Sequence, residues 1–355
     1  MIALDMDGTL LGEDGRVSPR NLAALLAAEA AGIEIVVATG RRHSYAMRVL
    51  RPLGLHHASA LVSSNGTVTR TLGSSSLATE HIASALIART HLPHATALWL
   101  CAHLEEFRNA LVLTFDRAGP DGDDTRGALV VEHLDELHSS IGRWMSANEP
   151  YIAHVNPIEN ALAYTENDAN GANLNAPIQA MLCGSIDRMA RAEARLLEHP
   201  GVTASGHPSG RSGATMNGAG TPKPGGPSFP VSLERVGCLS TESEPTPILT
   251  LHRTEYPDRD LSILDILPAG CSKGAALLSL AAIRGIHQSQ ILAIGDNWND
   301  VSMLEVAGAA VLMANGPDDL KELARERGWQ IGPSNRDDGV ADAIEAALSA
   351  ACEPA

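Results

Sequence analysis

The sequence predicts an α/β protein whose core is a parallel sheet, with a second, α+β domain inserted into that core. Two observations support this prediction. Short apolar runs alternate with helix-forming segments in residues 1–79 and again from residue 269 onward. Apolar strands that alternate with helices are typical of a parallel sheet covered on both faces. The residues between these parts lack the alternation, so one domain is expected to interrupt the other in sequence.

The N-terminal part predicts three strands and two helices. The strands cover residues 1–4, 33–38 and 60–62, and each ends at a polar or glycine-containing segment. The helices cover residues 21–31 and 43–50. Ser18 and Pro19 suit the cap and the first position of the first helix, and Gly32 suits its end.

The C-terminal part continues the same alternation. Strands are predicted over 291–294, 309–313 and 330–331, and helices over 273–284, 300–307, 317–328 and 340–350. Ser272 is a suitable N-cap for the first of these helices, and Gly285 and Gly328 are suitable stop signals. Residues 1–79 and 269–355 are therefore predicted to form one core domain.

The inserted part, residues 80–268, mixes both kinds of pattern. Strand-like runs occur at 111–115, 128–131 and 248–252, a helix-like run at 185–198, and an apolar run at 261–267 looks like a strand that returns to the core. This mixture predicts an α+β domain. Residues 203–247 are rich in Gly, Pro, Ser and Thr and poor in apolar periodicity. We predict a flexible loop there, because such a segment buries too little surface to offset the entropy of ordering.

The composition of the chain argues against several classes of protein. Acidic residues outnumber basic ones by 42 to 26, and a net charge of −16 disfavours a nucleic-acid-binding protein, which needs a basic face. The same acidity disfavours contact with a membrane surface. No apolar run is long enough to cross a bilayer. We therefore expect no nucleic-acid partner and no membrane partner.

The N-terminus and the cysteines indicate a cytoplasmic protein. Asp5 and Asp7 interrupt the first apolar run, where a secretory signal needs a long apolar stretch. The five cysteines are scattered and form no C-x-x-C pair, a pattern typical of reduced thiols rather than of a disulfide framework or a zinc site. Because the first predicted strand begins at the first residue, we also expect that the natural start lies upstream.

The first predicted strand ends in a segment with two aspartates, Asp5-Met6-Asp7-Gly8-Thr9-Leu10. In an open α/β sheet, ligands bind beyond the carboxyl ends of the strands. A tight loop there can aim Asp5 and Asp7 in different directions, and Gly8 lets backbone N–H groups approach an anion closely. Taken alone, the pattern also fits an ordinary acidic β-turn.

Two further pieces suit the binding of phosphate. Thr39 and Gly40 follow the second predicted strand, where a hydroxyl and a backbone N–H can hold phosphate oxygens. Lys273 lies in the first turn of a predicted helix, where its charge opposes the helix dipole. That mild penalty suggests that Lys273 neutralises nearby carboxylates or a phosphate. Taken alone, each piece is explained better by its ordinary reading, a turn for Thr39-Gly40 and a solvated lysine for Lys273.

The fourth piece, Gly295 to Asp300, follows the predicted strand at 291–294. Asp296 and Asp300 are four residues apart on a turn that enters a helix. This spacing can aim both at one pocket, where one binds a hard cation and the other anchors a lysine. The alternative is a helix cap together with a surface acid.

These four motifs, in this order, resemble the signature motifs of the haloacid dehalogenase superfamily. The position of the insertion, after the third strand, resembles the members with a C2-type cap, and further residues resemble the Cof-type, or IIB, subfamily. Those residues are Ser64-Asn65-Gly66, Ser272-Lys273-Gly274, Met303-Leu304, Met313-Ala314-Asn315 and Asn335 with Asp338-Gly339-Val340-Ala341. The resemblance implies a Rossmann-like core. It covers both core segments well and residues 80–268 loosely, and residues 203–247 do not resemble the usual cap.

The resemblance also implies an activity, namely a phosphatase that hydrolyses a small phosphorylated metabolite through an aspartyl-phosphate. Asp5 would be the nucleophile, and Asp7 would protonate the leaving oxygen and then activate water. Mg²⁺ would be held by Asp5, by the backbone carbonyl of Asp7 and by Asp296. An aspartate two residues after the nucleophile resembles the motif of the phosphatases and phosphomutases in this superfamily.

The remaining roles implied by the resemblance concern the substrate. Thr39, Gly40, Lys273 and the backbone near Gly8 would bind the phosphoryl oxygens, together with Asn299. Asp300 would orient Lys273. The sequence leaves the substrate open, and the resemblance implies a sugar phosphate first, with nucleotide, pyridoxal and flavin phosphates as alternatives. Capped members often work as monomers, and the sequence leaves the oligomeric state open.

Two alternative functions stay open at this point. The first is a phosphomutase of the same superfamily, which transfers the phosphoryl group to an acceptor sugar without releasing phosphate. The second is a catalytically silent protein that binds a phosphorylated metabolite or has a regulatory role. The complete set of Asp5, Asp7, Lys273 and Asp296 argues against the second.

Overall fold

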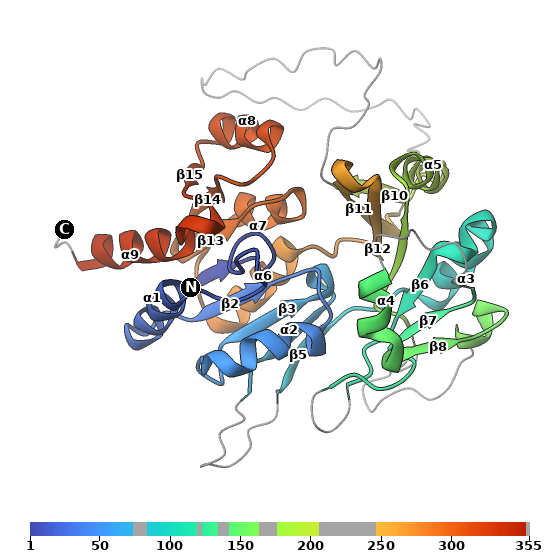
Figure 1. Ribbon diagram of the computed structural model, residues 1–355, viewed down its shortest axis with the longest axis horizontal. Helices are drawn as coiled ribbons and strands as arrows, with labels where there is room; N and C mark the ends of the chain where they lie inside the picture. The colour runs from blue at the N-terminus through green and yellow to red at the C-terminus, as the bar shows by residue number, and fades with distance from the viewer. Residues whose placement is uncertain (74–83, 119–122, 134–141, 163–175, 206–245, 353–355) are drawn as a thin grey trace, which may run out of the picture.

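The computed structural model describes residues 1–73, 84–118, 123–133, 142–162, 176–205 and 246–352. These residues form an eight-stranded sheet and a seven-stranded sheet in two lobes that lie side by side (Figure 1). Both ends of the chain build the first lobe, and the middle of the chain builds the second.

The first sheet joins strands from both ends of the chain. Its order is β15 (Gln330–Gly332), β14 (Ala309–Met313), β13 (Leu292–Gly295), β1 (Ile2–Leu4), β2 (Ile35–Ala38), β3 (Ala60–Ser63), β4 (Val68–Thr71) and β5 (Leu86–Arg89). The strands from β15 to β3 are parallel, which confirms the predicted parallel α/β core. The chain winds outward in one direction from β1 and in the other from β13. Such a switch point is where open α/β sheets bind ligands.

Helices cover both faces of this sheet, as the apolar strands predict. One face packs against α1 (Pro19–Ala30), α2 (His43–Leu50) and α9 (Gly339–Cys352). The other face packs against α6 (Lys273–Arg284), α7 (Val301–Val306) and α8 (Asp318–Arg327). Strand side chains alternate between the two cores, so that Leu4 and Val37 contact the first group and Ala3 and Val36 the second.

Two predicted helix starts form as expected. The side chain of Ser18 accepts a hydrogen bond from the backbone N–H of Asn21 at the start of α1, and the side chain of Ser272 accepts one from Ala275 at the start of α6. Each hydroxyl satisfies an N–H that has no partner within its helix. The cap at Ser272 matters for the site because it fixes the turn that carries Lys273.

The first sheet extends further along the chain than predicted. β3 turns back into β4, β4 pairs with β5, and both pairings are antiparallel. The boundary expected between residues 79 and 80 therefore leaves β5 out of the sheet to which it is bonded. The side chains of this edge strand are half-buried or exposed. Leu86–Arg89 therefore carries too little apolar pattern to be distinguished from the inserted part.

The second sheet comes from the middle of the chain. Its order is β10 (Val202–Ser205), β11 (Leu249–Tyr256), β12 (Leu261–Pro268), β9 (Gln179–Gly184), β6 (Leu111–Thr114), β7 (Leu129–Val131) and β8 (Ile152–His154). The four strands predicted in this part of the chain are present as β6, β7, β11 and β12. Its pairings are antiparallel except at the two edges, β10 with β11 and β7 with β8.

The predicted loop at 203–247 is wrong for its first residues. Residues 203–205 belong to β10 and pair in parallel with β11. Backbone hydrogen bonds to a neighbouring strand order these residues, although their side chains show no apolar period. Residues 206–245 of the predicted loop lie outside the described residues.

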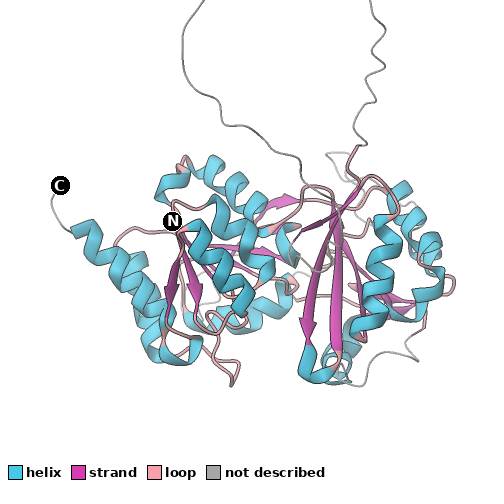
Figure 2. Cartoon of the chain, turned by 90° about the horizontal axis from the view of Figure 1, so that it is seen from above, coloured by secondary structure: helices cyan, strands magenta, loops and turns pink. Residues whose placement is uncertain are grey.

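The two faces of the second sheet have different surroundings. Helices α3 (His94–His103) and α5 (Ile186–Leu197) cover its outer face (Figure 2). Side chains such as Leu100 and Met189 make the packing contacts. At its β7–β8 end, the face toward the first lobe packs against Met145 of α4 (Gly142–Asn148). The rest of that inner face carries several polar side chains. None of the helices in the described parts of the chain is long and apolar enough to cross a membrane.

Buried charged side chains connect the two lobes. Arg42, directly before α2, binds Asp124 and Asn148 of the second lobe. Arg70 of β4 and Arg89 of β5 both bind Asp116, at 2.7 and 3.2 Å. The arginine and aspartate side chains in these pairs are at most 10% exposed. Because an unpaired buried charge is costly, these pairs hold the second lobe in a defined position over the first.

We predict that Asp124→Ala lowers the free energy of unfolding by about 3 kcal/mol, because it leaves the buried Arg42 guanidinium without its carboxylate. Urea unfolding followed by circular dichroism measures the change. Asp318→Ala is the control, since it removes an ion pair with Lys321 whose carboxylate is 97% exposed. That control should change the value by less than about 1 kcal/mol. Equal effects of the two substitutions would contradict the role given to the buried pair.

Candidate active site

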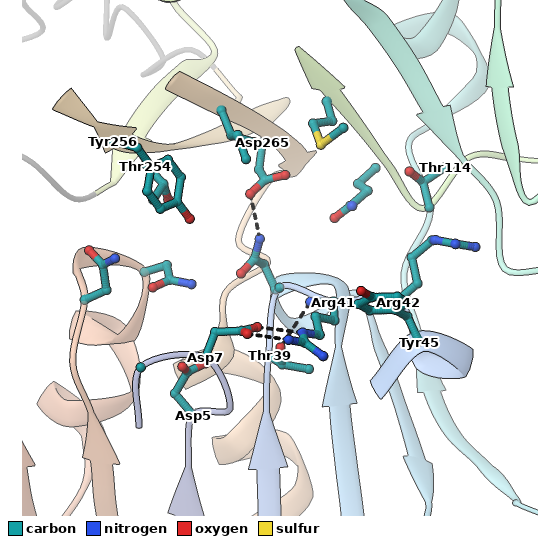
Figure 3. Close-up of a pocket in the computed structure, with 18 of the residues that line it drawn as sticks. Asp5, Asp7, Thr39, Arg41, Arg42, Tyr45, Thr114, Thr254, Tyr256 and Asp265 are labelled. Atoms are coloured by element: carbon teal, nitrogen blue, oxygen red, sulfur yellow. Dashed lines mark hydrogen bonds and ion pairs between the residues drawn. The ribbon is translucent and has the colours of Figure 1, made fainter. Parts of the chain in front are cut away.

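A cavity of about 570 Å³ lies between the two lobes, at the switch point of the first sheet (Figure 3). Loops that follow β1, β2 and β13 form its first-lobe wall. They bring together most of the predicted site residues, which are Asp5, Asp7, Gly8, Thr39, Gly40, Asp296 and Asn299. Residues of the second sheet form the opposite wall. The strand-end motifs therefore meet at one edge of the sheet, as their positions in the sequence predict.

Lys273 is the buried cation behind the first-lobe wall. Its side chain is fully buried, and Nζ donates to Oδ1 of Asp5 and, at 2.6 Å, to Oδ1 of Asp300. Burial alone would lower the pKa of Lys273, but the two carboxylates outweigh it and raise the pKa. Lys273 therefore stays charged. It contacts Asp5 directly and is not among the residues that line the cavity.

Asp300 has the anchoring position that its spacing from Asp296 predicts. Oδ1 binds Lys273, and Oδ2 accepts hydrogen bonds from the backbone N–H groups of Asp296 and Asn297 at 2.9 and 3.0 Å. Gly295 makes this turn possible, because a Cβ there would lie 2.6 Å from Cβ of Asp300. The alternative of a surface acid is excluded, since Asp300 is completely buried.

Asp5, Asp296 and Asp300 form a cluster that could hold a metal ion, with one oxygen of each within 4.8 Å of the others. Both oxygens of Asp300 already have partners in Lys273 and the backbone. Asp5 and Asp296 are therefore the two carboxylates of the cluster that line the cavity. Carboxylate oxygens are the ligands that Mg²⁺ and Ca²⁺ prefer.

The electrostatics of this pair favour the binding of a cation. Burial, and then repulsion from Asp300, raise the pKa of Asp5 to about 7, although Lys273 opposes the shift. Burial and the charge of Asp5 raise the pKa of Asp296 well above its ordinary value. Two adjacent buried carboxylates both ionise readily when a cation lies between them. The donor set therefore fits a divalent metal ion.

Gly8 has a steric role beside the pair. Its φ is +81°, and a Cβ at this position would lie 2.2 Å from Oδ2 of Asp296. Another residue would therefore be strained and would displace the carboxylate. This contact explains why glycine follows the two aspartates.

Asp7 points away from Asp5, as predicted for two carboxylates on a tight loop. Its side chain is 55% exposed, and Nε of Arg41 donates to its Oδ2 at 2.7 Å (Figure 3). Thr39 is nearby, and its hydroxyl accepts a hydrogen bond from the backbone N–H of Arg41 at 3.1 Å. Thr39, Gly40 and Arg41 thus form one hydrogen-bonded turn at the cavity.

The structure adds residues to the site that the sequence interpretation did not assign. Thr9 donates to Oδ1 of Asp296 at 2.8 Å, and Asn315 donates to the carbonyl of Gly8 at 2.8 Å and to Oδ2 of Asp296 at 3.3 Å. Asn65 donates across the cavity to Oδ2 of Asp265 in β12 at 3.0 Å (Figure 3). In the sequence, Asp265 stands out only as a single acidic residue within an apolar predicted strand.

Fold and site together define a class of protein: an α/β enzyme-like core in which strand-end carboxylates surround a buried lysine. The chain belongs to the haloacid dehalogenase-like hydrolases, because the model of that family matches residues 2–111 and 250–344, more than half of the chain. This match confirms the resemblance inferred from the four motifs.

Relatives and solved structures agree with this membership. The chain is 26% identical to phosphatase YwpJ of Bacillus subtilis over 91% of this chain and 92% of that protein. It is 47% identical to 5-amino-6-(5-phospho-D-ribitylamino)uracil phosphatase YwtE of the same organism, over 24% of this chain and 29% of that protein. Several other curated relatives are likewise matched over less than half of their length.

Two solved structures show the same fold over nearly the whole chain. A haloacid dehalogenase-like hydrolase from B. subtilis has a TM-score of 0.63 at 22% identity, covering 97% of this chain and 98% of that one. The subclass IIB sugar phosphatase BT4131 has a TM-score of 0.59 at 15% identity, covering 98% of each chain. Both sheets are therefore part of a shared architecture.

We predict that Asp265→Asn changes how stability depends on pH. Burial raises the pKa of Asp265 to about 7 in the folded protein, against 3.8 for the ordinary carboxyl. Between these values the folded state keeps a proton that the unfolded state has lost, so the free energy of unfolding falls as pH rises from about 4 to 7. The loss is at most about 4 kcal/mol, at ~1.4 kcal/mol per pKa unit.

Urea unfolding at pH 5 and pH 8, with EDTA present, measures this effect. Between the two pH values, the free energy of unfolding should decrease less in the Asn variant than in the wild type, because an asparagine at position 265 cannot titrate. An equal decrease in both proteins would rule out an Asp265 whose pKa is raised in the folded state.

Proposed function

We propose that this protein is a phosphatase that removes the phosphoryl group from a small phosphorylated metabolite, through an aspartyl-phosphate on Asp5. One observation carries the proposal. The carboxylate of Asp5 lines the cavity while Lys273, completely buried, binds its Oδ1. A carboxylate held in a fixed orientation beside a cation is suited to attack an electrophile that carries negative charge.

The proposed reaction has two steps. In the first, a carboxylate oxygen of Asp5 attacks phosphorus, the bond from phosphorus to the ester oxygen breaks, and Asp7 gives that oxygen a proton. In the second, Asp7 takes a proton from a water molecule, and the water oxygen attacks phosphorus. The bond from phosphorus to Asp5 breaks, which releases inorganic phosphate and restores the Asp5 carboxylate. Asp7 suits both steps because it lies at the cavity and is exposed enough to exchange protons with solvent.

The proposed metal ligands are the carboxylates of Asp5 and Asp296 and the backbone carbonyl of Asp7. A bound Mg²⁺ would supply positive charge that lets a carboxylate approach an anionic phosphate. Thr9 and Asn315 support this site from behind, because both donate to Asp296 and fix the direction of its oxygens.

The proposed phosphate ligands are the hydroxyl of Thr39, the side chain of Asn299, and backbone N–H groups near Gly8 and Gly40, all of which line the cavity. Lys273 would add its charge from behind Asp5, and Asp300 would keep it oriented. In the structure Arg41 holds Asp7. A phosphate anion would attract Arg41 and free Asp7 to reach the leaving oxygen.

We propose that the second lobe is the C2-type cap of this enzyme. Its sheet forms the wall opposite Asp5, so bound substrate would be shielded from bulk water. The name of BT4131 makes sugar phosphates the first substrates to test. The buried free thiols of Cys101, Cys183 and Cys271 support a reducing, cytoplasmic location.

We predict that Asp5→Asn abolishes phosphate release from small phosphate esters while the fold is kept, because the amide is a poor nucleophile. Release by the wild type should require Mg²⁺ and stop with EDTA. Inorganic phosphate is measured for both proteins, with circular dichroism as the control for folding. Substantial release by the Asn variant, or release by the wild type that is insensitive to EDTA, would contradict the proposed chemistry.

Lys273→Met should lower kcat by about 10²–10³-fold, the usual cost of removing one electrostatic contact to developing charge. Methionine keeps most of the volume of the buried stem and removes the ammonium. Lys321→Met is the matched control, since Lys321 pairs with an exposed carboxylate on α8 and should be without effect on kcat. Unchanged kinetics in a folded Lys273→Met protein would refute the role of Lys273.

A further inference from the structure

We propose that Gln179 and Asp265 form a recognition pair for the alcohol part of the substrate. The pair selects an alcohol that donates hydrogen bonds and carries no second anionic group. This inference rests on the proposed phosphatase activity and concerns the wall of the cavity opposite Asp5.

Strand register places both residues on the inner face of the second sheet. Gln179 lies opposite Thr114 of β6, and Met181, two residues further along β9, lies opposite Asp265 of β12. All four line the cavity. The intervening Ala180 belongs to the apolar core on the outer face, as the alternation of side chains along a strand requires. Two mostly apolar strands thus present polar groups to the cavity.

Gln179 carries an acceptor without a partner. The residue is 4% exposed, and in the described parts of the chain its Oε1 is buried without a hydrogen bond. Leaving such an atom unpaired destabilises the protein, and native proteins keep such atoms rare. A ligand that donates a hydrogen bond would satisfy it.

Asp265 adds further acceptor capacity at the same wall. Within the described residues, Nδ2 of Asn65 donates a hydrogen bond to Oδ2 of Asp265 at 3.0 Å. A carboxylate accepts several hydrogen bonds, so this one leaves room for a donor from the ligand. Oδ1 of Asn65 is also buried and without a partner within the described residues. Gln179, Asp265 and Asn65 together favour a ligand that is rich in O–H or N–H groups.

The charges around the cavity disfavour a second anionic group. Among the described residues that line it, the cations are Arg41 and Arg42, and each already binds a carboxylate, Asp7 and Asp124 respectively. A carboxylate or phosphate on the alcohol part would lie near Asp265 without a cation of its own. A cavity of about 570 Å³ is of the size that small-molecule ligands occupy.

Three phosphate esters of equal chain length test the proposal. Sorbitol 6-phosphate has a neutral polyol chain, 6-phosphogluconate replaces its terminal CH₂OH with a carboxylate, and hexyl phosphate lacks the hydroxyls. Assays at pH 8.5 keep Asp265 ionised, since its pKa is about 7. The wild type should show kcat/KM for sorbitol 6-phosphate about 100-fold above 6-phosphogluconate and about 10-fold above hexyl phosphate. Equal values for the three esters would overturn the proposal.

Two variants test whether Gln179 and Asp265 cause the preference for sorbitol 6-phosphate. Asp265→Asn keeps an oxygen for Asn65 and removes the charge, so it should reduce the discrimination against 6-phosphogluconate about 10-fold. Gln179→Leu keeps most of the volume and removes the amide, so it should reduce the preference for sorbitol 6-phosphate over hexyl phosphate by a similar factor. Asp258→Asn is the control, on the exposed turn between β11 and β12. Unchanged ratios in both folded variants would overturn the assignment.

p-Nitrophenyl phosphate separates this proposal from the one on which it rests. If the wild type releases phosphate from neither this activated ester nor the other three, the phosphatase activity itself is refuted. If it hydrolyses p-nitrophenyl phosphate but does not prefer sorbitol 6-phosphate, the activity stands and the recognition pair is refuted.

Discussion

The buried ammonium of Lys273 is the interaction on which the geometry of the site depends. It binds Asp5, which is 268 residues away in sequence, and Asp300, which follows β13. A lysine without solvent is tolerable only with such partners, so the end of β1, the start of α6 and the turn after β13 must come together. The second oxygen of Asp300 then fixes the backbone of Asp296. One cation therefore positions Asp5 and Asp296, the two carboxylates of the cluster that line the cavity.

The same cluster is electrostatically incomplete. Asp5 and Asp296 are buried close together, and burial, followed by repulsion from neighbouring carboxylates, raises the pKa of both. A core selected for stability alone would avoid this arrangement, and such local conflicts are typical of functional sites. A divalent cation relieves the repulsion, which ties the proposed cofactor to the fold. The buried ion pairs between the lobes bring the second sheet over this site.

Much of the first lobe could be predicted from the sequence because its signals are local. Apolar runs gave the parallel strands, Ser18 and Ser272 gave helix starts, and aspartates at strand ends gave the cluster. The remainder depends on contacts between distant residues. β5 is an edge strand with no apolar face of its own, and the short β10 is ordered by pairing with β11. Asp265 and Gln179 meet the cavity only because strand register turns them inward, and Arg41 reaches Asp7 across two loops.

The covalent intermediate on Asp5 is the central claim, and trapping it is the most direct test. Wild-type protein is mixed with Mg²⁺ and a phosphate ester that it hydrolyses, quenched during turnover, and treated with borohydride, which reduces an acyl-phosphate to an alcohol. Peptide mass spectrometry then locates the modified residue. We expect homoserine in place of Asp5 in the N-terminal peptide, dependent on substrate. An unmodified Asp5, or modification of another residue in protein that is turning over, would contradict the account.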